Sequence, residues 1–269
     1  MDAVTDMSEK DKKKKKLSRS GKVILDILLV CAIGTAAFSG FQLITIWNNY
    51  RAARETYDKV RQAAIKETAD PQASADPYDP GIDWDALKAI NPDMAGWIRL
   101  DGTVVDYPFV YASDDEYYLE HLFDGTVKHS GTVFVDADNQ QNFQDKNTLL
   151  YAHNMKDGSM FASISEYKNQ DFYNEHKIIK IWTPDAYYEL HPLGGIITDG
   201  WDTYVQTTFA SDDAFMDYVN YFVSNSTFKS EDSVSAEDQT VVLSTCNYHK
   251  NNGRYALLCK LVKVHEFSK

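Results

Sequence analysis

A cysteine ends an apolar β-type run within residues 241–255, VVLSTCNYHKNNGRY, and an arginine follows it eight residues later. A cysteine attacks a carbonyl carbon as a thiolate, which needs a nearby cation or base. Side chains alternate along a strand, so Val242, Ser244 and Cys246 share one face of the run. Cys246 is therefore a candidate nucleophile at a strand end, although a cysteine packed in a core gives the same pattern.

His153 is the histidine best placed to act as a base for this thiol. It ends the run NTLLYAH and opens the loop NMKDGSMF, so its imidazole can project from the end of a sheet. A loop histidine that caps a turn would look the same. His249 is close to Cys246 in sequence but poorly placed if the chain turns away. The remaining histidines lack special sequence surroundings and are expected to be surface or half-buried residues: His121, His129, His176, His191 and His265.

Arg254 is the candidate cation, because it begins the next β-type run. If residues 246 and 254 flank one connection between adjacent antiparallel strands, both side chains lie at the same end of the sheet. A guanidinium there stays charged and offers five N–H donors to an anionic oxygen. The alternative is a surface ion pair in an acidic protein, which contributes little energy.

The three cysteines bear on the redox state of the site. Cys31 lies inside a long apolar segment and cannot pair with the others. Cys246 and Cys259 could form a disulfide in an oxidising compartment. A domain of about 190 residues can build its core without such a bond, so two free thiols are predicted. Neither C-x-x-C nor H-E-x-x-H occurs, so we expect no metal and no other cofactor.

An N-terminal segment predicts a membrane anchor. Residues 23–47 are mainly apolar with one charge, Asp26, and as a helix they would reach about 37 Å, enough to cross a hydrocarbon core of about 30 Å. A cleaved signal peptide is the alternative, but the apolar run is long and lacks a clear small-x-small cleavage pattern. Lysines before the segment and Trp47 at its far edge predict a cytoplasmic N-terminus and an exported body.

The distribution of charge argues against one class of partner. The chain has 27 basic and 40 acidic residues, and residues 1–22 hold eight and four of them, which leaves 19 basic and 36 acidic residues in the rest. The chain after residue 22 is acidic enough to repel phosphate backbones, and its aromatic residues are not interleaved with basic clusters. Nucleic acid is not an expected partner.

Short β-type runs alternate with turn signals from residue 96 onward, which predicts a mainly β, mainly antiparallel sandwich or barrel. The runs are GWIRL, VVDYPFVY, GTVFV, NTLLYAH, KIIKIW, AYYELHPLGGIIT, TYVQTTF, TVVLSTC and RYALLCKLVKV.

Helices are expected before and within this β region. A polar helix with an apolar stripe at Tyr50, Tyr57, Val60 and Ala64 follows the anchor, either leaning on the domain or acting as a stalk. A Pro-containing linker follows near residues 70–81. Ser211 is the predicted N-cap of a helix that interrupts the strands late in the domain. Further short helices are expected over residues 82–91, 112–123 and 160–176.

Taken together, LSTC, LLYAHNM and an arginine shortly after the cysteine resemble the sortases, membrane-anchored cysteine transpeptidases of Gram-positive cell surfaces. NPDMAGWIRLDGTVVDYPFVY, DDEYYLEHLFDG, GTVFVDADN and GSMFASISEY look like the class B branch. The resemblance covers roughly residues 82–264. The chain departs from it at Ala152, where the family usually has glycine, and no acidic residue stands between Cys246 and Arg254 to orient the imidazole.

The resemblance implies a closed eight-stranded β-barrel with N-terminal helices and a helix inserted before the cysteine strand. It implies Cys246 as nucleophile, His153 as general acid and base, and Arg254 as the group that stabilises the oxyanion and holds the substrate. By their positions in the motifs, the residues expected to contact the substrate are Ser244, Thr245 and Leu119.

The resemblance also implies a division of the chain and a set of partners. The expected parts are a cytoplasmic tail (1–22), a transmembrane anchor (23–47), a juxtamembrane helix and linker (48–81) and an extracellular catalytic domain (82–269). The expected partners are an LPxTG-like or NPxTx-like sorting peptide, an amine acceptor from a peptidoglycan precursor or a pilin lysine, and the membrane through one helix.

Two rival functions are compatible with the same residues. An exported cysteine peptidase would use water as the acceptor in place of an amine. A membrane-tethered adhesion or binding module would carry an inert Cys246. Sequence alone does not separate these from a transpeptidase.

Overall fold

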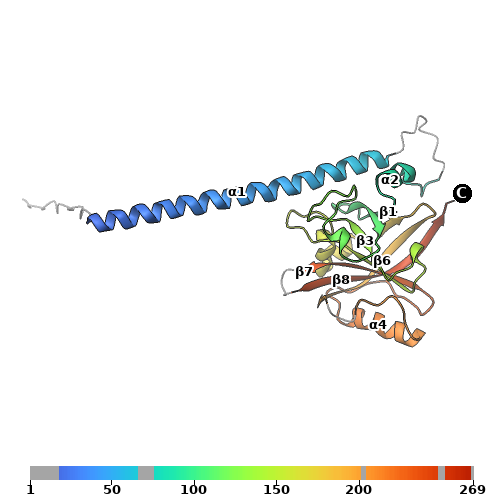
Figure 1. Cartoon of the computed structure of the whole chain (residues 1–269). Coiled ribbons are helices and arrows are strands. Elements are labelled where there is room, and N and C mark those ends of the chain that lie inside the picture. The colour runs from blue at the N-terminus through green and yellow to red at the C-terminus, as the bar shows by residue number, and fades with distance from the viewer. Residues whose placement is uncertain (1–17, 66–75, 201–203, 248–251, 268–269) are drawn as a thin grey trace, which may run out of the picture. The chain divides into compact units, whose positions relative to one another are not determined.

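The computed structural model describes residues 18–65, 76–200, 204–247 and 252–267 (Figure 1). The chain separates into two compact units, residues 1–48 and 49–269. Most of the basic tail, part of the predicted linker and His249 lie outside the described residues.

The first unit contains the start of helix α1, Arg19–Ala64. Large apolar side chains from Val23 to Trp47 are exposed along it. By length and composition α1 is able to cross a membrane, which agrees with the predicted span.

The last turns of α1 belong to the second unit and pack into its core. Ala53, Tyr57, Val60 and Ala64 are buried there, at the three-to-four-residue spacing that puts side chains on one face of a helix. The Tyr57 hydroxyl donates a hydrogen bond of 2.6 Å to the carbonyl of Gly131. The juxtamembrane part of α1 therefore leans on the domain, and its predicted apolar stripe is confirmed.

Eight strands close into a barrel, as the family resemblance implies. Their bounds are β1 Met94–Arg99, β2 Asp106–Tyr111, β3 Val133–Val135, β4 Asn147–Tyr151, β5 Ile179–Trp182, β6 Ala186–Asp199, β7 Gln239–Asn247 and β8 Gly253–Glu266. The order around the barrel is β1-β2-β3-β4-β7-β8-β6-β5. Neighbouring strands are antiparallel except for β2 with β3 and β4 with β7, which are parallel.

Side chains of β4 and β7 alternate between two apolar layers. Leu150 and Leu243 belong to the main core. Leu149 and Val242 belong to a second layer, which they form with residues such as Phe222 of helix α4, Asp212–Ser224. Both faces of the β4–β7 pair are therefore buried, which rigidifies the part of the sheet that carries Cys246.

The described helices follow the sequence pattern in most places. They are α2 Trp84–Ile90, α3 Gln170–Glu175, α4, and the 3₁₀ helices η1 Tyr117–Leu119, η2 Gln141–Phe143 and η3 Ala162–Lys168. Ser211 caps α4 as predicted, because its Oγ accepts a hydrogen bond from the amide of Ala214. Helices in residues 82–91 and 160–176 are likewise confirmed.

The helix predicted over residues 112–123 is limited to η1. The carboxylate of Asp114 accepts hydrogen bonds from the amides of Glu116 and Tyr117, at 2.9 and 2.7 Å, and such local bonds compete with helix extension. Beyond η1 the chain folds back on itself, since His121 pairs antiparallel with Val127.

The strand predicted from the run TYVQTTF, residues 203–209, is wrong for its described part. Residues 204–209 form turns and irregular backbone. A closed barrel leaves no free strand edge for another strand to join. The carbonyls of Tyr204 and Gln206 instead accept hydrogen bonds from the Tyr218 hydroxyl and the Asn147 amide group.

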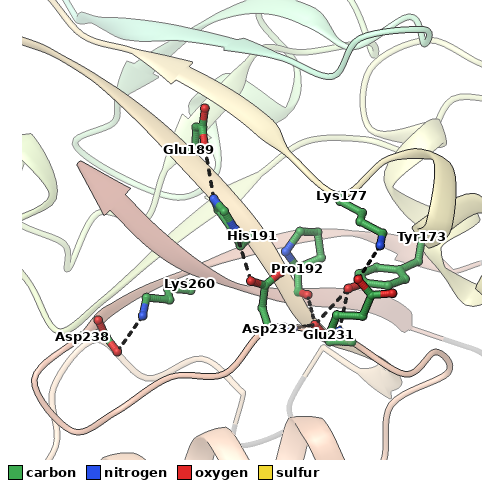
Figure 2. Close-up of polar contacts among 10 residues, drawn as sticks. Tyr173, Lys177, Glu189, His191, Pro192, Glu231, Asp232, Asp238 and Lys260 are labelled. Carbon is green, nitrogen blue, oxygen red and sulfur yellow. Dashed lines mark hydrogen bonds and ion pairs between the residues drawn. The ribbon is translucent and has the colours of Figure 1, made fainter. Parts of the chain in front are cut away.

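Residues 225–238 connect α4 to β7, and side-chain contacts fasten the segment 229–238 to the barrel (Figure 2). The Ser230 hydroxyl donates a hydrogen bond of 2.7 Å to the carbonyl of Pro192 on β6. The Glu231 amide donates one of 2.8 Å to the hydroxyl of Tyr173 on α3.

Charged contacts continue along the same segment. His191 lies between Glu189 and Asp232, with nitrogen–oxygen distances of 3.3 and 3.4 Å. Lys260 on β8 pairs with Asp238 at 3.0 Å. Figure 2 shows these contacts reaching the segment from β6 and β8, directly before β7 begins.

Removing the Tyr173 hydroxyl should loosen this segment. Tyr173→Phe leaves the amide of Glu231 without its partner, so we expect a loss of about 1–2 kcal/mol in the free energy of unfolding. Urea unfolding of the full-length protein in detergent measures it. Lys177→Met is the control, because it removes only contacts of an exposed ammonium group, the ion pair with Glu231 and the cation–π contact with the Tyr173 ring, and should cost less than Tyr173→Phe. Equal losses in both variants would contradict this account.

Candidate active site

Cys246 and Arg254 stand opposite each other on β7 and β8. These strands pair antiparallel, and their register sets Cys246 against Arg254. Directly opposed residues of antiparallel strands project to the same face, with Cβ atoms about 5 Å apart. The thiol and the guanidinium therefore start from neighbouring backbone positions, as a hairpin connection between residues 246 and 254 would require.

His153 reaches the same place from β4, which runs parallel to β7 with Tyr151 beside Ser244. The amide of Ala152 donates a hydrogen bond of 3.2 Å to the carbonyl of Ser244, so pairing continues one residue beyond β4. His153 follows directly, next to the end of β7 that carries Cys246. Ala152 is buried and has a negative φ, so no glycine is needed at this position.

The three side chains leave the sheet on one face. Val242 on β7 and Ala256 on β8 point to the layer that contains α4. Side chains alternate between the two faces of a strand, so Cys246, four residues after Val242, and Arg254, two residues before Ala256, project to that same face. The same alternation from Leu149 on β4 places His153 there as well.

Asn154 ties the loop after His153 to the strand of the candidate nucleophile. Its side-chain amide donates a hydrogen bond of 2.9 Å to the carbonyl of Cys246. The amide of Phe161 donates one of 2.9 Å to the carbonyl of His153. The backbone on both sides of the imidazole is thereby fixed relative to β7.

A backbone carbonyl orients the imidazole of His153. Its Nε2 lies 2.9 Å from the carbonyl oxygen of Leu119, and because a carbonyl only accepts hydrogen bonds, Nε2 carries the proton. Nδ1 is then the nitrogen free to take up or release a proton. Burial lowers the pKa of His153, and the Leu119 hydrogen bond partly opposes this. The neutral imidazole is thus favoured near neutral pH.

Arg254 is held by its own backbone surroundings. Its Nη1 donates to the carbonyls of Gly253 and Asn252, at 3.1 and 3.4 Å. Within the described ranges no carboxylate forms an ion pair with it, so the surface ion-pair alternative has no partner there. Its charge acts on the site, since Arg254 adds to the lowering of the His153 pKa after burial and His129.

A cavity of about 400 Å³ opens beside these groups, and all six predicted site residues line it: Cys246, His153, Arg254, Ser244, Thr245 and Leu119. The rest of its lining includes the aromatic residues Phe134, Tyr151 and Tyr204 and the acidic residues Asp115, Asp136 and Asp138. The lining therefore combines aromatic rings with carboxylates beside the three candidate catalytic groups.

Two hydroxyl groups of β7 differ in their surroundings. Ser244 Oγ lies 3.0 Å from the hydroxyl of Tyr204. Thr245 Oγ1 is buried and, among the described residues, has no hydrogen-bond partner.

Among the acidic residues that line the cavity, Asp115 has a raised pKa, which is caused by burial and by the neighbouring charges of Asp136 and Asp138.

Sequence reasoning missed several groups that surround these residues. The backbone carbonyl of Leu119 contacts His153, and the side-chain amide of Asn154 binds the backbone carbonyl of Cys246; only the fold reveals both contacts. Asn154 does follow His153 within LLYAHNM, so the motif contained that signal. His129 is exposed as expected, yet its ring contacts that of His153. No group of three or more His, Cys, Asp or Glu side chains in the described ranges could hold a metal.

Cys246 and Cys259 are both free in the structure. Cys246 pairs with Arg254 across the ladder and Cys259 pairs with Val241, so five residues of strand, about 17 Å, separate the two thiols. A disulfide needs Cα atoms within about 7 Å. Cys259 is fully buried, and burial raises its thiol pKa.

Alkylation should therefore distinguish the two thiols. In a Cys31→Ala background, the denatured and unreduced full-length protein should take up two iodoacetamide labels, whereas the native protein in detergent should be labelled at Cys246 alone. Intact-mass and peptide mass spectrometry measure both states. Absence of labels after denaturation would mean a disulfide and would remove Cys246 as a candidate nucleophile.

Curated proteins similar to this chain are sortases, although no protein-family model matches it. Sortase B of Listeria monocytogenes is 31% identical over 238 residues, which cover 87% of this chain and 95% of the relative. Sortase B of Staphylococcus aureus is 28% identical over 243 residues, which cover 90% and 96%.

Solved structures agree with these relatives. The Staphylococcus aureus sortase B–substrate complex has a TM-score of 0.72 at 28% identity and covers 80% of this chain and 98% of its own. A sortase B complexed with triglycine has a TM-score of 0.71 at 29% identity, covering 80% and 99%. Sortase B of Bacillus anthracis reaches 0.70 at 31% identity, covering 81% and 100%. With a common barrel and sequence identity along nearly its whole length, this chain belongs to the class B sortases, a family of cysteine transpeptidases.

Proposed function

We propose that this sortase cleaves a sorting peptide after threonine through an acyl-enzyme on Cys246 and transfers the peptide to an amine. One observation carries the proposal. Cys246, His153 and Arg254 project from adjacent strands into one cavity of about 400 Å³. A thiol, a base and a fixed cation are the groups that acyl transfer to and from cysteine requires.

In the first half of the reaction, Cys246 Sγ attacks the carbonyl carbon of the threonine, and the thiol proton passes to Nδ1 of His153. As the carbon–nitrogen bond breaks, His153 returns this proton to the departing amine, and a thioester remains on Cys246. The Leu119 carbonyl supports this assignment because it occupies Nε2 of the imidazole. The lowered pKa of His153, caused first by burial, keeps Nδ1 available as a proton acceptor.

Arg254 stabilises the negative oxygen that develops on the attacked carbonyl. Its guanidinium N–H groups beyond Nη1 have no partner among the described residues, so they are available to the reacting peptide. A donor aimed at a developing oxyanion typically contributes about 3–4 kcal/mol to catalysis.

In the second half, an amine attacks the thioester. His153 takes a proton from the incoming nitrogen and returns it to the sulfur as the carbon–sulfur bond breaks. The acceptor is a peptidoglycan cross-bridge amine or a pilin lysine, and the donor peptide is LPxTG-like or NPxTx-like. Solved relatives with a substrate and with triglycine support peptide donors and amine acceptors.

Ser244, Thr245 and Leu119 are the proposed substrate contacts. All three line the cavity that holds Cys246. The Thr245 hydroxyl has no partner of its own within the described part of the chain, so a bound peptide can satisfy it after a small rearrangement. Ser244 is held by Tyr204 at 3.0 Å, which makes it a fixed part of the wall.

The proposed setting is the outer face of a cell membrane. Residues 1–22 form the cytoplasmic tail, 23–47 the anchor, 48–81 the juxtamembrane helix and linker, and 82–269 the extracellular catalytic domain. An anchored enzyme meets substrates that emerge at the same membrane at a high effective concentration.

Mass spectrometry tests the reaction. Full-length protein in detergent, incubated with a panel of LPxTG-like and NPxTx-like peptides, should gain the mass of the acyl fragment on Cys246 and yield an amide when triglycine is added. His153→Ala should abolish turnover, because no base remains for the thiol proton. His249→Ala, in the loop after Cys246, should matter far less.

Two results would favour the rival functions. Hydrolysis alone, even with excess amine, indicates a cysteine peptidase. A protein that forms no acyl-enzyme with any peptide is an inert tethered module. Equal losses in the His153 and His249 variants would contradict the assignment of the base.

Arg254→Lys separates an oxyanion donor from a general charge. Lysine keeps the charge but not the planar set of donors, so we expect kcat/KM for a sorting peptide to fall by about 100-fold or more. A role limited to a surface ion pair predicts nearly unchanged activity. Circular dichroism of Arg254→Lys and Arg254→Ala should match that of the unaltered protein.

Protease accessibility tests the proposed orientation. With an epitope tag at the N-terminus, protease added to intact cells should cut residues beyond about 50 and leave the tag intact, because lysines remain on the cytoplasmic side. Immunoblotting of the tag reports the result. Loss of the tag without prior lysis would reverse the orientation.

A further inference from the structure

His153 has an aromatic neighbour that the proposed mechanism does not use. The ring of His129 lies against it, with centroids 4.7 Å apart and ring planes at 40°. Nδ1 of His129 lies 3.1 Å from Oε1 of Glu120. A second histidine and its own carboxylate thus stand beside the imidazole that exchanges protons with Cys246.

One hairpin, residues 119–129, presents all the groups involved. Its first residue, Leu119, accepts the hydrogen bond from His153 Nε2. The carbonyl of Glu120 then accepts a hydrogen bond of 2.8 Å from the amide of Lys128, which brings the next residue, His129, back beside Glu120. The backbone that orients His153 therefore also sets the distance between the two imidazoles.

We propose that His129 and Glu120 are positioning residues for His153, which together set how readily its imidazole takes up a second proton. The proposal rests on the proposed function for the role of that proton in acyl transfer. His129, when charged, opposes a charge on His153, and the carboxylate of Glu120 favours one. Because their effects on the proton affinity of His153 are opposite, the imidazole can both take a proton from a thiol and give it to an amine.

The charges around His153 support this balance. Burial is the largest cause of its lowered pKa, and the charges of His129 and Arg254 lower it further, while Glu120 raises it. The cavity that His153 lines holds further titratable groups, namely Cys246, Tyr151, Tyr204, Asp115, Asp136 and Asp138.

The surroundings of His129 itself are simpler. Glu120 and His153 face it, and the ammonium group of Lys128 is directed to the side chain of Asn49 at 3.0 Å. The side chains of His129 and Glu120 are 69% and 56% exposed, so water and salt weaken their influence.

Neutral substitutions of similar size test the two effects separately. His129→Gln removes the charge that opposes protonation, so the titration midpoint of His153 should rise. Adding Glu120→Gln in that background removes only the attraction, so the midpoint should fall again. Full-length protein in detergent, labelled with carbon-13 in its histidine rings, gives the midpoint by NMR, and His153→Gln identifies the signal.

His121→Gln is the matched control. His121 belongs to the same hairpin, but its ring stacks on Tyr117 with centroids 3.8 Å apart, so its replacement should leave the midpoint of His153 unchanged. The acidic limb of the pH profile of kcat/KM should move with the titration midpoint of His153 in the His129 and Glu120 variants. High salt should shrink both shifts, since both groups are exposed.

The results separate this inference from the proposed function. Opposite shifts in the two steps support the positioning role, even if no sorting peptide is turned over, in which case only the proposed function fails. Normal turnover with an unmoved midpoint, or two shifts in one direction, overturns the positioning role and leaves the proposed function intact.

Discussion

Hydrogen bonds between β7 and its neighbours β4 and β8 bring together three side chains from distant parts of the chain. The register that sets Cys246 against Arg254 also sets Ser244 beside Tyr151, and with it His153 beside the thiol. A slip of one residue would turn Cys246 to the opposite face of the sheet. The chemistry of the site therefore depends on this ladder before it depends on any single side chain.

The rest of the molecule protects that register. Both faces of the β4–β7 pair are covered by apolar layers, and closure of the barrel gives every strand two neighbours. The segment 229–238 enters β7 only after contacts with β6, β8 and α3 have fixed its path. At the other end of β7, Asn154 holds the carbonyl of Cys246. Polar contacts thus fix the two ends of a strand whose middle is held by packing.

Most of the strands could be predicted from the sequence, because alternating apolar runs report local burial. The run TYVQTTF failed because its apolar residues report packing without strand pairing: Tyr204 is buried in the second apolar layer, and Phe209 packs against α4. The three residues with proposed chemistry followed from type, spacing and strand ends. The groups that control His153 did not, because the carbonyl of Leu119 has no sequence signature and His129 reaches His153 only through a hairpin. The sequence around His129 contains no motif that would single it out.

The parallel pairing of β4 with β7 also orders the assembly of the molecule. β5, β6 and α4 lie between these strands, so about 90 residues separate His153 from Cys246 in the chain. Closing so long a loop costs entropy before any contact is gained, and contacts of this range form slowly. A chain synthesised from its N-terminus completes β4 near the middle of its length and the cysteine strand almost last. Cys246 therefore lies beside His153 only after β7 has paired with β4. In any folding intermediate that forms before this pairing, the thiol of Cys246 lacks its base.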